Sequence, residues 1–137
     1  MSQILRNRIK CSNCNDVITS RHVHDYVTCS CGSVSTDGGL MYCRRGWEDG
    51  ASYEDMSVYD DGKHETRREA LEWGKNYSKE GVRLPETKYV KISEMDDDHI
   101  CNILNQLLYI SKIYKQTFED EIIWREEQLM TQISTKG

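Results

Sequence analysis

Proline and phenylalanine are scarce in this sequence, with one of each among 137 residues. It has no apolar run approaching the roughly 18 residues of a membrane-spanning helix. Its first residues, 1–6, lack the apolar stretch of a secretory signal peptide. Nucleophile-elbow, Walker-loop, dinucleotide-binding and zinc-protease motifs are also missing. We therefore expect a cytoplasmic chain with no membrane association, and we disfavour an enzyme of a standard kind.

Positive charge is in short supply as well, because 18 Lys and Arg face 23 Asp and Glu, for a formal net charge of -5. The charge is distributed unevenly: it is +3 over residues 1–47, -6 over 48–62, +3 over 63–92 and -5 over 93–137. Tight nucleic-acid binding depends mainly on clustered Lys and Arg. The overall composition disfavours that function, although a local basic face within residues 1–47 remains an alternative.

Cysteine is the residue type that stands out. Four of the six cysteines form two close pairs, Cys11-x-x-Cys14 and Cys29-x-Cys31, separated by 14 residues. Cytoplasmic thiols stay reduced, so close pairs indicate metal ligands rather than disulfides. Four sulfurs at the corners of a tetrahedron make a closed structural zinc site. The sequence therefore predicts structural zinc at Cys11, Cys14, Cys29 and Cys31.

Two histidines between the cysteine pairs leave alternatives open. The Cys29-x-Cys31 spacing is tighter than that of a standard zinc knuckle, which leaves room for a substitute ligand. His22 and His24 would face the same side of a strand. We interpret them as surface residues or as residues that contact the zinc ligands without binding the metal. In the alternatives, one of them replaces a cysteine, or both act with Asp25 to hold a catalytic zinc with an open position, as in a zinc-dependent hydrolase.

The first half of the chain has the pattern of short strands. We expect a strand over 4–10, a hairpin within 16–28, a strand over 34–36, a turn at 37–39 and a partner strand over 40–45. Residues 46–62 are acidic and contain glycine, which indicates an exposed loop or an edge strand.

The second half changes to helical periodicity. Thr66 and Glu69 fit a capping box for a short helix with Ala70, Leu71 and Trp73 inward. Pro85 is expected in a connection, followed by a strand over 88–92. Apolar stripes then run from 100 to 108 and from 114 to 133, and the acids Asp96–Asp98 before His99 are explained as helix-capping residues. We favour a break near Ser111 and an antiparallel helix pair, with one long helix over 96–131 as the alternative.

These patterns predict an α+β chain of two packed parts. Residues 1–62 would form a zinc-ribbon-like, β-rich module with an acidic aromatic loop. Residues 63–137 would form an α-rich module with the order helix, strand, helix, helix. An exposed stripe on the last helix would also allow a homodimer through the C-terminal helices.

Two groups of residues are candidates for binding. Arg44 and Arg45 lie close to Gly38-Gly39 and would suit a phosphate of a nucleic acid or a small nucleotide. Trp47, Tyr53 and Tyr59 stand among acids, and exposed aromatics of this kind are typical of protein–protein interfaces.

The chain also resembles a group of small uncharacterised proteins of tailed bacteriophages and prophages. The resemblance is carried by Cys11-x-x-Cys14, Cys29-x-Cys31-Gly32, Ser35–Gly39, Arg68–Gly74, Tyr89–Ile92, Met95–Ile100 and Phe118–Glu121. It implies a phage accessory protein that joins a zinc-ribbon-like module to a helical one and acts in bacterial cytoplasm. Such proteins often modify or block host proteins, including those of antiviral defence. The resemblance implies no catalytic residue.

Overall fold

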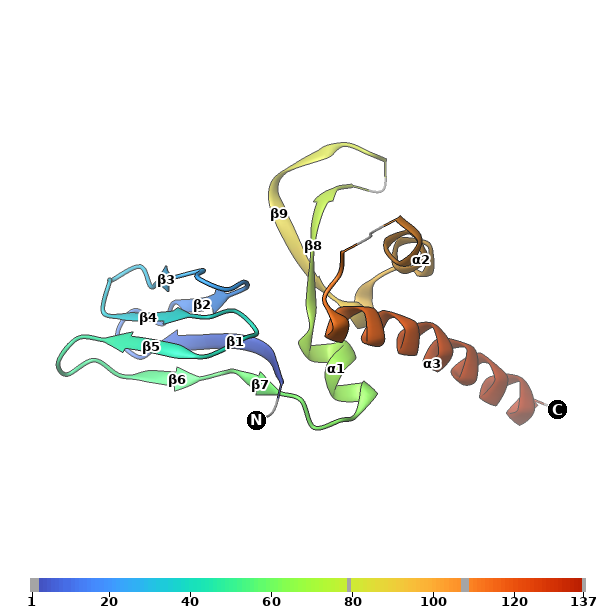
Figure 1. The fold of residues 1–137 in the computed structure, drawn as a ribbon, viewed down its shortest axis with the longest axis horizontal. Coiled ribbons are helices and arrows are strands. Elements are labelled where there is room, and N and C mark those ends of the chain that lie inside the picture. The colour runs from blue at the N-terminus through green and yellow to red at the C-terminus, as the bar shows by residue number, and fades with distance from the viewer. Residues whose placement is uncertain (1–2, 79, 107–108, 137) are drawn as a thin grey trace. The chain divides into compact units, whose positions relative to one another are not determined.

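A computed structural model describes residues 3–78, 80–106 and 109–136, with side chains as far as residue 132. The chain divides into two compact units, Met1–Asp61 and Gly62–Gly137. Among the described residues, the first unit contains strands and the second contains every helix (Figure 1). The predicted α+β fold class is confirmed.

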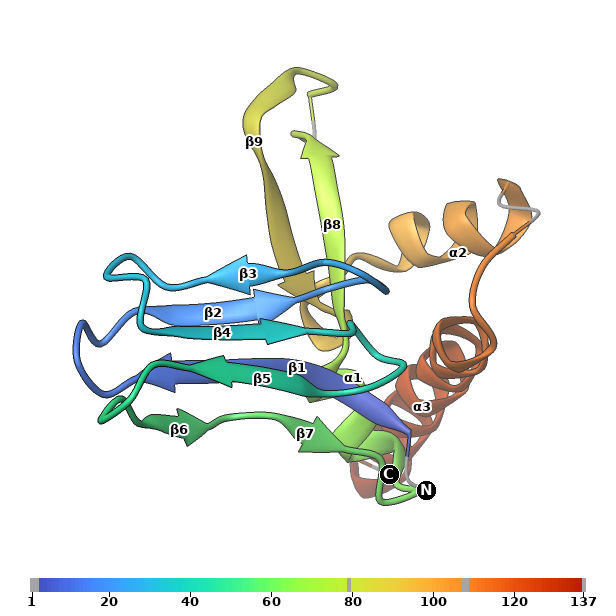
Figure 2. The same ribbon diagram turned by 60° about the vertical axis from the view of Figure 1, so that its left-hand side comes forward.

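The first unit is organised around its first strand. Its strands are β1 (Ile4–Cys11), β2 (Val17–Ser20), β3 (Val27–Thr28), β4 (Val34–Asp37), β5 (Arg44–Trp47), β6 (Tyr53–Asp55) and β7 (Val58–Tyr59). Strand β1 pairs antiparallel with β2, β6 and β7, and β3, β4 and β5 form a second antiparallel sheet (Figure 2). Part of the acidic segment 46–62 is therefore paired strand.

Two expectations about this unit were wrong. The hairpin predicted within 16–28 does not form, because β2 pairs with β1 while β3 pairs with β4 in the other sheet. The strand expected over 40–45 begins only at Arg44. Residues 38–43 form a longer turn in which the Met41 N–H donates to the Gly38 carbonyl at 3.0 Å, and both Gly38 and Gly39 have positive φ.

Buried and less buried side chains alternate along β1, and the buried ones form the core of the first unit. Leu5, Asn7, Ile9 and Cys11 are buried on one face, as the two-residue period of a strand requires. Ile9 and Cys11 pack in a buried cluster with Ile18, Cys29 and Val34. Two of the four paired cysteines are thus part of the hydrophobic core.

A buried polar network connects β1 to the second sheet. Asn7 is fully buried, and its amide nitrogen donates to the carbonyls of Asp37, Gly39 and Tyr42 at 3.0–3.2 Å. The Asn7 Oδ1 accepts from Arg45 Nη1 at 2.7 Å. This network fixes the turn between β4 and β5.

The second unit contains α1 (His64–Ala70), β8 (Glu72–Tyr77), β9 (Arg83–Lys91), the 3-10 turn η1 (Ile92–Glu94), α2 (Asp97–Gln106) and α3 (Lys112–Lys136). Strands β8 and β9 form an antiparallel hairpin. Trp73 on β8 packs edge-on against Tyr114 and Phe118 of α3, with ring centroids 5.5 and 5.3 Å apart. The hairpin therefore packs on a helix through its aromatic residue.

The order expected for this unit lacked one strand. Helix α1 ends at Ala70, Leu71 is already extended, and Trp73 lies in β8 rather than in a helix. The capping box at Thr66 and Glu69 is not formed, because the helix begins at His64 and its N-cap, Lys63, makes no side-chain cap bond. The predicted strand over 88–92 is the end of the longer β9, which also contains Pro85.

The break between the two long helices is confirmed, because α2 ends at Gln106 and α3 starts at Lys112. The antiparallel arrangement was wrong: α2 is viewed end-on in Figure 1 while α3 lies across the view. Ile100, Ile103 and Phe118 of the predicted stripes are buried, but Leu129 is exposed. Leu107, Leu108 and the side chain of Ile133 lie outside the described residues. No described helix is long and apolar enough to cross a membrane.

A carboxylate at the centre of the second unit binds α1 to α3. Glu121 is fully buried and accepts hydrogen bonds from Arg68 Nε at 2.7 Å, Arg68 Nη2 at 2.9 Å, His64 Nε2 at 2.8 Å and Arg125 Nε at 2.8 Å. Arg68 also lies 3.9 Å above the Trp124 ring. Burial raises the pKa of Glu121, but these hydrogen bonds outweigh it and hold the pKa below its usual value.

Candidate metal centre

Two tight turns bring the cysteine pairs together. Cys11 is the last residue of β1, and its N–H and carbonyl bond to the Asp16 carbonyl and the Asn15 N–H, both at 2.9 Å. Cys29 follows β3, where its N–H donates to the Val34 carbonyl at 3.0 Å. Because β3 pairs with β4 in the second sheet and Cys11 ends a strand of the first, each sheet supplies one turn.

The four sulfurs form one cluster. The Sγ atoms of Cys11, Cys14, Cys29 and Cys31 all lie within 4.8 Å of one another. Cys31 Sγ is 3.7 Å from Cys11 Sγ and 3.6 Å from Cys29 Sγ. The tight Cys29-x-Cys31 spacing therefore does not prevent the predicted four-sulfur arrangement, which can hold a metal ion.

Hydrogen-bond donors surround the sulfurs. Ser33 Oγ lies 3.0 Å from Cys31 Sγ and 3.4 Å from Cys11 Sγ. Asn13 donates its backbone N–H to Cys11 Sγ at 3.3 Å and its side-chain amide to Cys31 Sγ at 3.4 Å. Such donors orient thiolate ligands and stabilise their charge. Sequence reasoning missed Asn13 and Ser33, although each stands within two residues of a paired cysteine.

These contacts favour thiolates. The Ser33 hydroxyl and the Asn13 amide lower the pKa of Cys31 to about 5, and the Ser33 hydroxyl also lowers the pKa of Cys11. The backbone N–H groups of Asp16 and Cys31 favour the Cys14 thiolate, but burial and the neighbouring sulfurs outweigh them and raise its pKa. A cation at the centre of the cluster would favour thiolates at all four positions.

A carboxylate links the two turns. Asp16 Oδ2 accepts from the Ser30 N–H at 2.9 Å and from the Ser30 hydroxyl at 2.8 Å. The turn after Cys11 is therefore tied to the residue between Cys29 and Cys31. These hydrogen bonds connect the two cysteine turns independently of any metal ion bound by the sulfurs.

The histidines lie elsewhere. His22 and His24 are exposed in the turn between β2 and β3, His22 Nε2 is 3.9 Å from Asp25, and His24 Nδ1 is 3.4 Å from the Tyr42 hydroxyl. Within the described part of the chain, the four cysteines are the sole group of three or more His, Cys, Asp and Glu residues placed to hold a metal. The structure therefore does not bring His22, His24 and Asp25 together as a metal site.

The two arginines differ in their surroundings. Arg44 is exposed, 6.0 Å from the Tyr42 ring. Arg45 uses its guanidinium within the unit, donating to Asn7, Thr36, Asp55 and Ser57 at 2.7–3.2 Å. The pair therefore does not present two guanidinium groups to a phosphate.

The aromatic residues of the acidic segment stand at the surface of the first unit. Trp47 is 62% exposed at the end of β5, and its ring centroid is 6.2 Å from that of the half-buried Tyr53 on β6. Tyr59 on β7 is exposed, and its hydroxyl donates to Cys43 Sγ at 3.6 Å. Trp47 and Tyr53 thus form a ring pair, and Tyr59 is separate from it in the described contacts.

A comparison with protein-family models gives one match, to a domain of unknown function, DUF7695, over residues 3–47. No curated protein and no solved structure matches the chain. The matched segment contains all four clustered cysteines and ends at Trp47, so β6 and β7 lie beyond it. The first part of the chain is therefore similar to a family whose description names neither a metal nor an activity.

Proposed function

We propose that this protein is a non-enzymatic, phage- or prophage-encoded accessory protein, stabilised by structural zinc, that binds and modulates a host protein in the bacterial cytoplasm. The four-sulfur cluster supports the zinc, and the exposed Trp47 beside Tyr53 supports the partner surface. The phage origin and the host target, including a target in antiviral defence, rest on the sequence resemblance.

Zinc suits the geometry of the cluster. Sulfurs bound at about 2.3 Å to a tetrahedral zinc lie roughly 3.8 Å apart. The distances from Cys31 Sγ to the sulfurs of Cys11 and Cys29, 3.7 and 3.6 Å, are close to that edge length. A site with four thiolates has no coordination position for water, so it serves folding rather than metal catalysis.

The observation that carries the binding function is the aromatic–acidic surface, which we define as Trp47, Tyr53, Glu48, Asp49 and Glu54. Trp and Tyr are the residues most often found at the energetic centre of protein interfaces. The three acids are exposed, and a cavity of about 380 Å³ beside Glu48 and Asp49 also reaches Asn13 and Ser33. This surface suits a partner that presents Lys or Arg beside an apolar group.

The binding function is tested by affinity purification of the tagged protein from bacterial lysate, followed by binding to the purified partner. Trp47→Ala and the double change Glu48→Lys/Asp49→Lys should each weaken binding at least about tenfold, as expected for central interface residues. Met41→Ala is the matched control, because Met41 is also exposed in the first unit but belongs to no part of this surface. Equal binding by all three variants would reject the surface.

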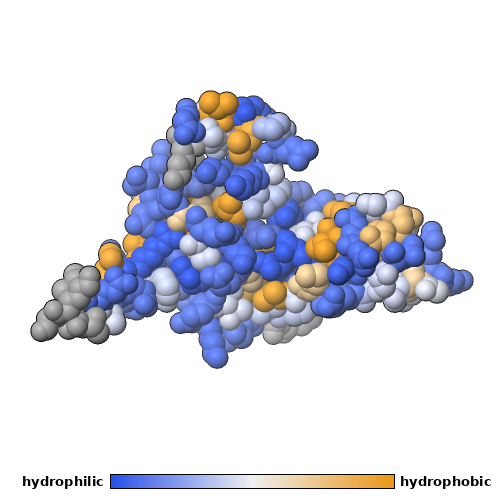
Figure 3. Space-filling model, turned by 180° about the vertical axis from the view of Figure 1, so that it is seen from behind, coloured by the Kyte–Doolittle hydropathy of each residue, from blue (hydrophilic) through white to orange (hydrophobic). Residues whose placement is uncertain are grey.

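Self-association through α3 is a second proposed interaction. Ile123, Leu129 and Met130 are exposed on this helix, and Figure 3 shows hydrophobic residues near the C-terminal end of the described chain, among other hydrophobic patches on that face. Helices with exposed apolar stripes commonly pair between chains. Light scattering should give a dimer for the wild type and a monomer for Leu129→Gln/Met130→Gln, and a monomeric wild type would reject this interaction.

A further inference from the structure

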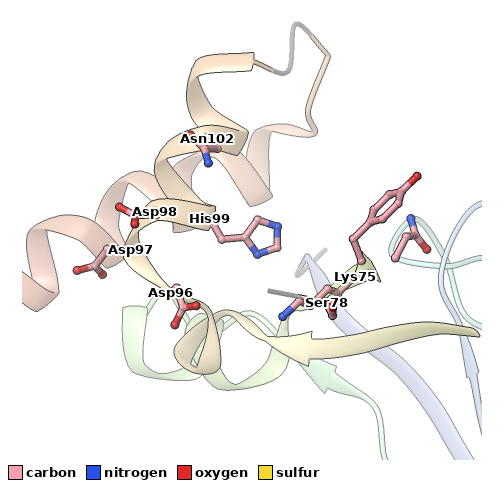
Figure 4. A pocket seen from close by; sticks show the side chains of 10 residues that line it. Lys75, Ser78, Asp96, Asp97, Asp98, His99 and Asn102 are labelled. Atoms are coloured by element: carbon pink, nitrogen blue, oxygen red, sulfur yellow. The ribbon is translucent and has the colours of Figure 1, made fainter. Parts of the chain in front are cut away.

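The second unit contains a cavity that the proposed function does not use. It has a volume of about 820 Å³ and lies between β8 and the start of α2 (Figure 4). Its lining comes from 74–78 on the hairpin side and from Asp96, Asp97, Asp98, His99 and Asn102 on the helix side. Pockets of about 300–1,000 Å³ are typical of small-molecule sites.

Three carboxylates also line the cavity, those of Asp96, Asp97 and Asp98. Figure 4 shows the carboxylates of Asp97 and Asp98 pointing away from His99, whose imidazole points toward the β8 side. Asp97 is also bound by the Arg125 guanidinium. Two of the three carboxylates thus point away from the imidazole of His99.

The hairpin carries two lysines on one face, of which Lys75 lines the cavity. Lys75 and Lys88 are direct partners in the β8–β9 register, so their side chains stand on the same face of the hairpin, which is also the face of Trp73. Neither lysine makes an ion pair or side-chain hydrogen bond in the part of the chain that the structure describes. Like charges directly opposite each other destabilise a strand pair. An anion beside Lys75 would relieve this repulsion.

His99 is electrostatically connected to the same lysine. Burial lowers the pKa of His99, and the positive charge of Lys75 lowers it further, while Asp96 acts in the opposite direction. The imidazole is therefore mainly uncharged near neutral pH and can donate or accept a hydrogen bond. His99 makes no hydrogen bond to any residue that the structure describes, which leaves this group free for a ligand.

We propose that the cavity binds a small phosphate-bearing ligand of nucleotide size. Lys75 would contact the phosphate, with Lys88 adding positive potential. His99 and the Asn102 amide would form hydrogen bonds to it, since both stand on the same side of the cavity. Tyr77, an exposed aromatic in the lining, offers a ring face for a base. This inference concerns the second unit and is independent of the proposed function.

The probes are 5′-AMP, adenosine and inorganic phosphate, titrated separately into the full chain as purified and followed by amide and imidazole NMR shifts. We expect 5′-AMP to bind most tightly, to shift the signals of Lys75, His99 and Asn102, and to be weakened by salt. Adenosine alone should bind at least about tenfold more weakly if the phosphate supplies one charge-assisted contact. Binding by inorganic phosphate equal to that of 5′-AMP would refute the nucleotide size of the site.

Single substitutions test whether 5′-AMP binds in this cavity. Lys75→Gln and His99→Gln should each weaken 5′-AMP binding about tenfold. Lys115→Gln, which changes an exposed lysine of α3 in the same unit, should leave it unchanged. Asn102→Asp is an additional variant at an exposed position and should weaken binding by adding negative charge. No shift with millimolar 5′-AMP, or equal affinity in Lys75→Gln and Lys115→Gln, would overturn the proposal.

Discussion

The fully buried Glu121 provides the sharpest stability prediction. Glu121→Gln keeps the size of the side chain but removes the charge that Arg68, His64 and Arg125 share. The amide NH₂ group of the new glutamine would also stand opposite N–H donors, at a position where a carboxylate oxygen accepts hydrogen bonds in the wild type. Removing one partner of a buried ion pair costs about 3–5 kcal/mol. For a unit of this size, about 1 kcal/mol shifts the melting temperature by roughly 4–8 °C, so we expect a fall of about 12 °C or more.

The measurement is thermal unfolding followed by tryptophan fluorescence in a Trp47→Phe background, where emission comes from Trp73 and Trp124 of the second unit alone. Glu119→Gln is the matched control, because it neutralises an exposed acid of the same helix. The control should change the free energy of unfolding by less than about 0.5 kcal/mol. A Glu121→Gln melting temperature within a few degrees of the wild type would refute the reasoning.

The same variant predicts a pH dependence. Because the folded-state pKa of Glu121 is held below its usual value, its ionisation stabilises the fold above the unfolded-state pKa, about 4.3. This stabilisation is lost as the pH falls through the lower, folded-state pKa. The stability gap between wild type and Glu121→Gln should therefore be largest near neutral pH and shrink below about pH 4. A gap that grows on acidification would contradict this assignment.

Three further predictions concern the first unit. Purified protein should contain one zinc per chain, and chelation should collapse the NMR dispersion of residues 3–61 while sparing the second unit; retained dispersion would reject a structural role for the metal. Asn7→Ala should lower the free energy of unfolding by about 2–3 kcal/mol, measured in urea, because it leaves buried carbonyls without donors. Gly39→Ala should cost more than Gly50→Ala in the same assay: both have positive φ, but only at Gly39 would the added Cβ meet the His22 backbone, at 2.5 Å. Equal losses of unfolding free energy in the two variants would contradict this prediction, because they would mean that the turn at Gly39 moves to accept the added Cβ.

The four-cysteine cluster was predictable from sequence because ligand type and spacing are local properties. The histidines were harder, since the expectation that they share a strand face failed when residues 21–26 formed the connection between sheets. Arg45 shows a different limit. It was read as a phosphate ligand, but its acceptor Asn7 lies 38 residues away in sequence, and no local pattern indicates that contact.

The second unit shows the same limit for strands. Trp73 follows a helix and was assigned to it, whereas its strand is defined by pairing with residues 83–91 across the chain. The segment Asp96–His99 was interpreted from its acids alone, because nothing nearby in the sequence shows that Lys75 is close enough to lower the pKa of His99. In the second unit, long-range pairing therefore decided both the strand that contains Trp73 and the surroundings of His99.

The position of β6 and β7 has a practical consequence for anyone expressing the first unit. The family match stops at residue 47, but both backbone edges of β1 are covered only when β6 and β7 are present. A fragment ending at residue 47 would leave the edge of β1 from Ile4 to Cys11 open to pairing with other chains. The natural cut for recombinant work is thus after residue 61, and a shorter fragment should aggregate however well it binds zinc.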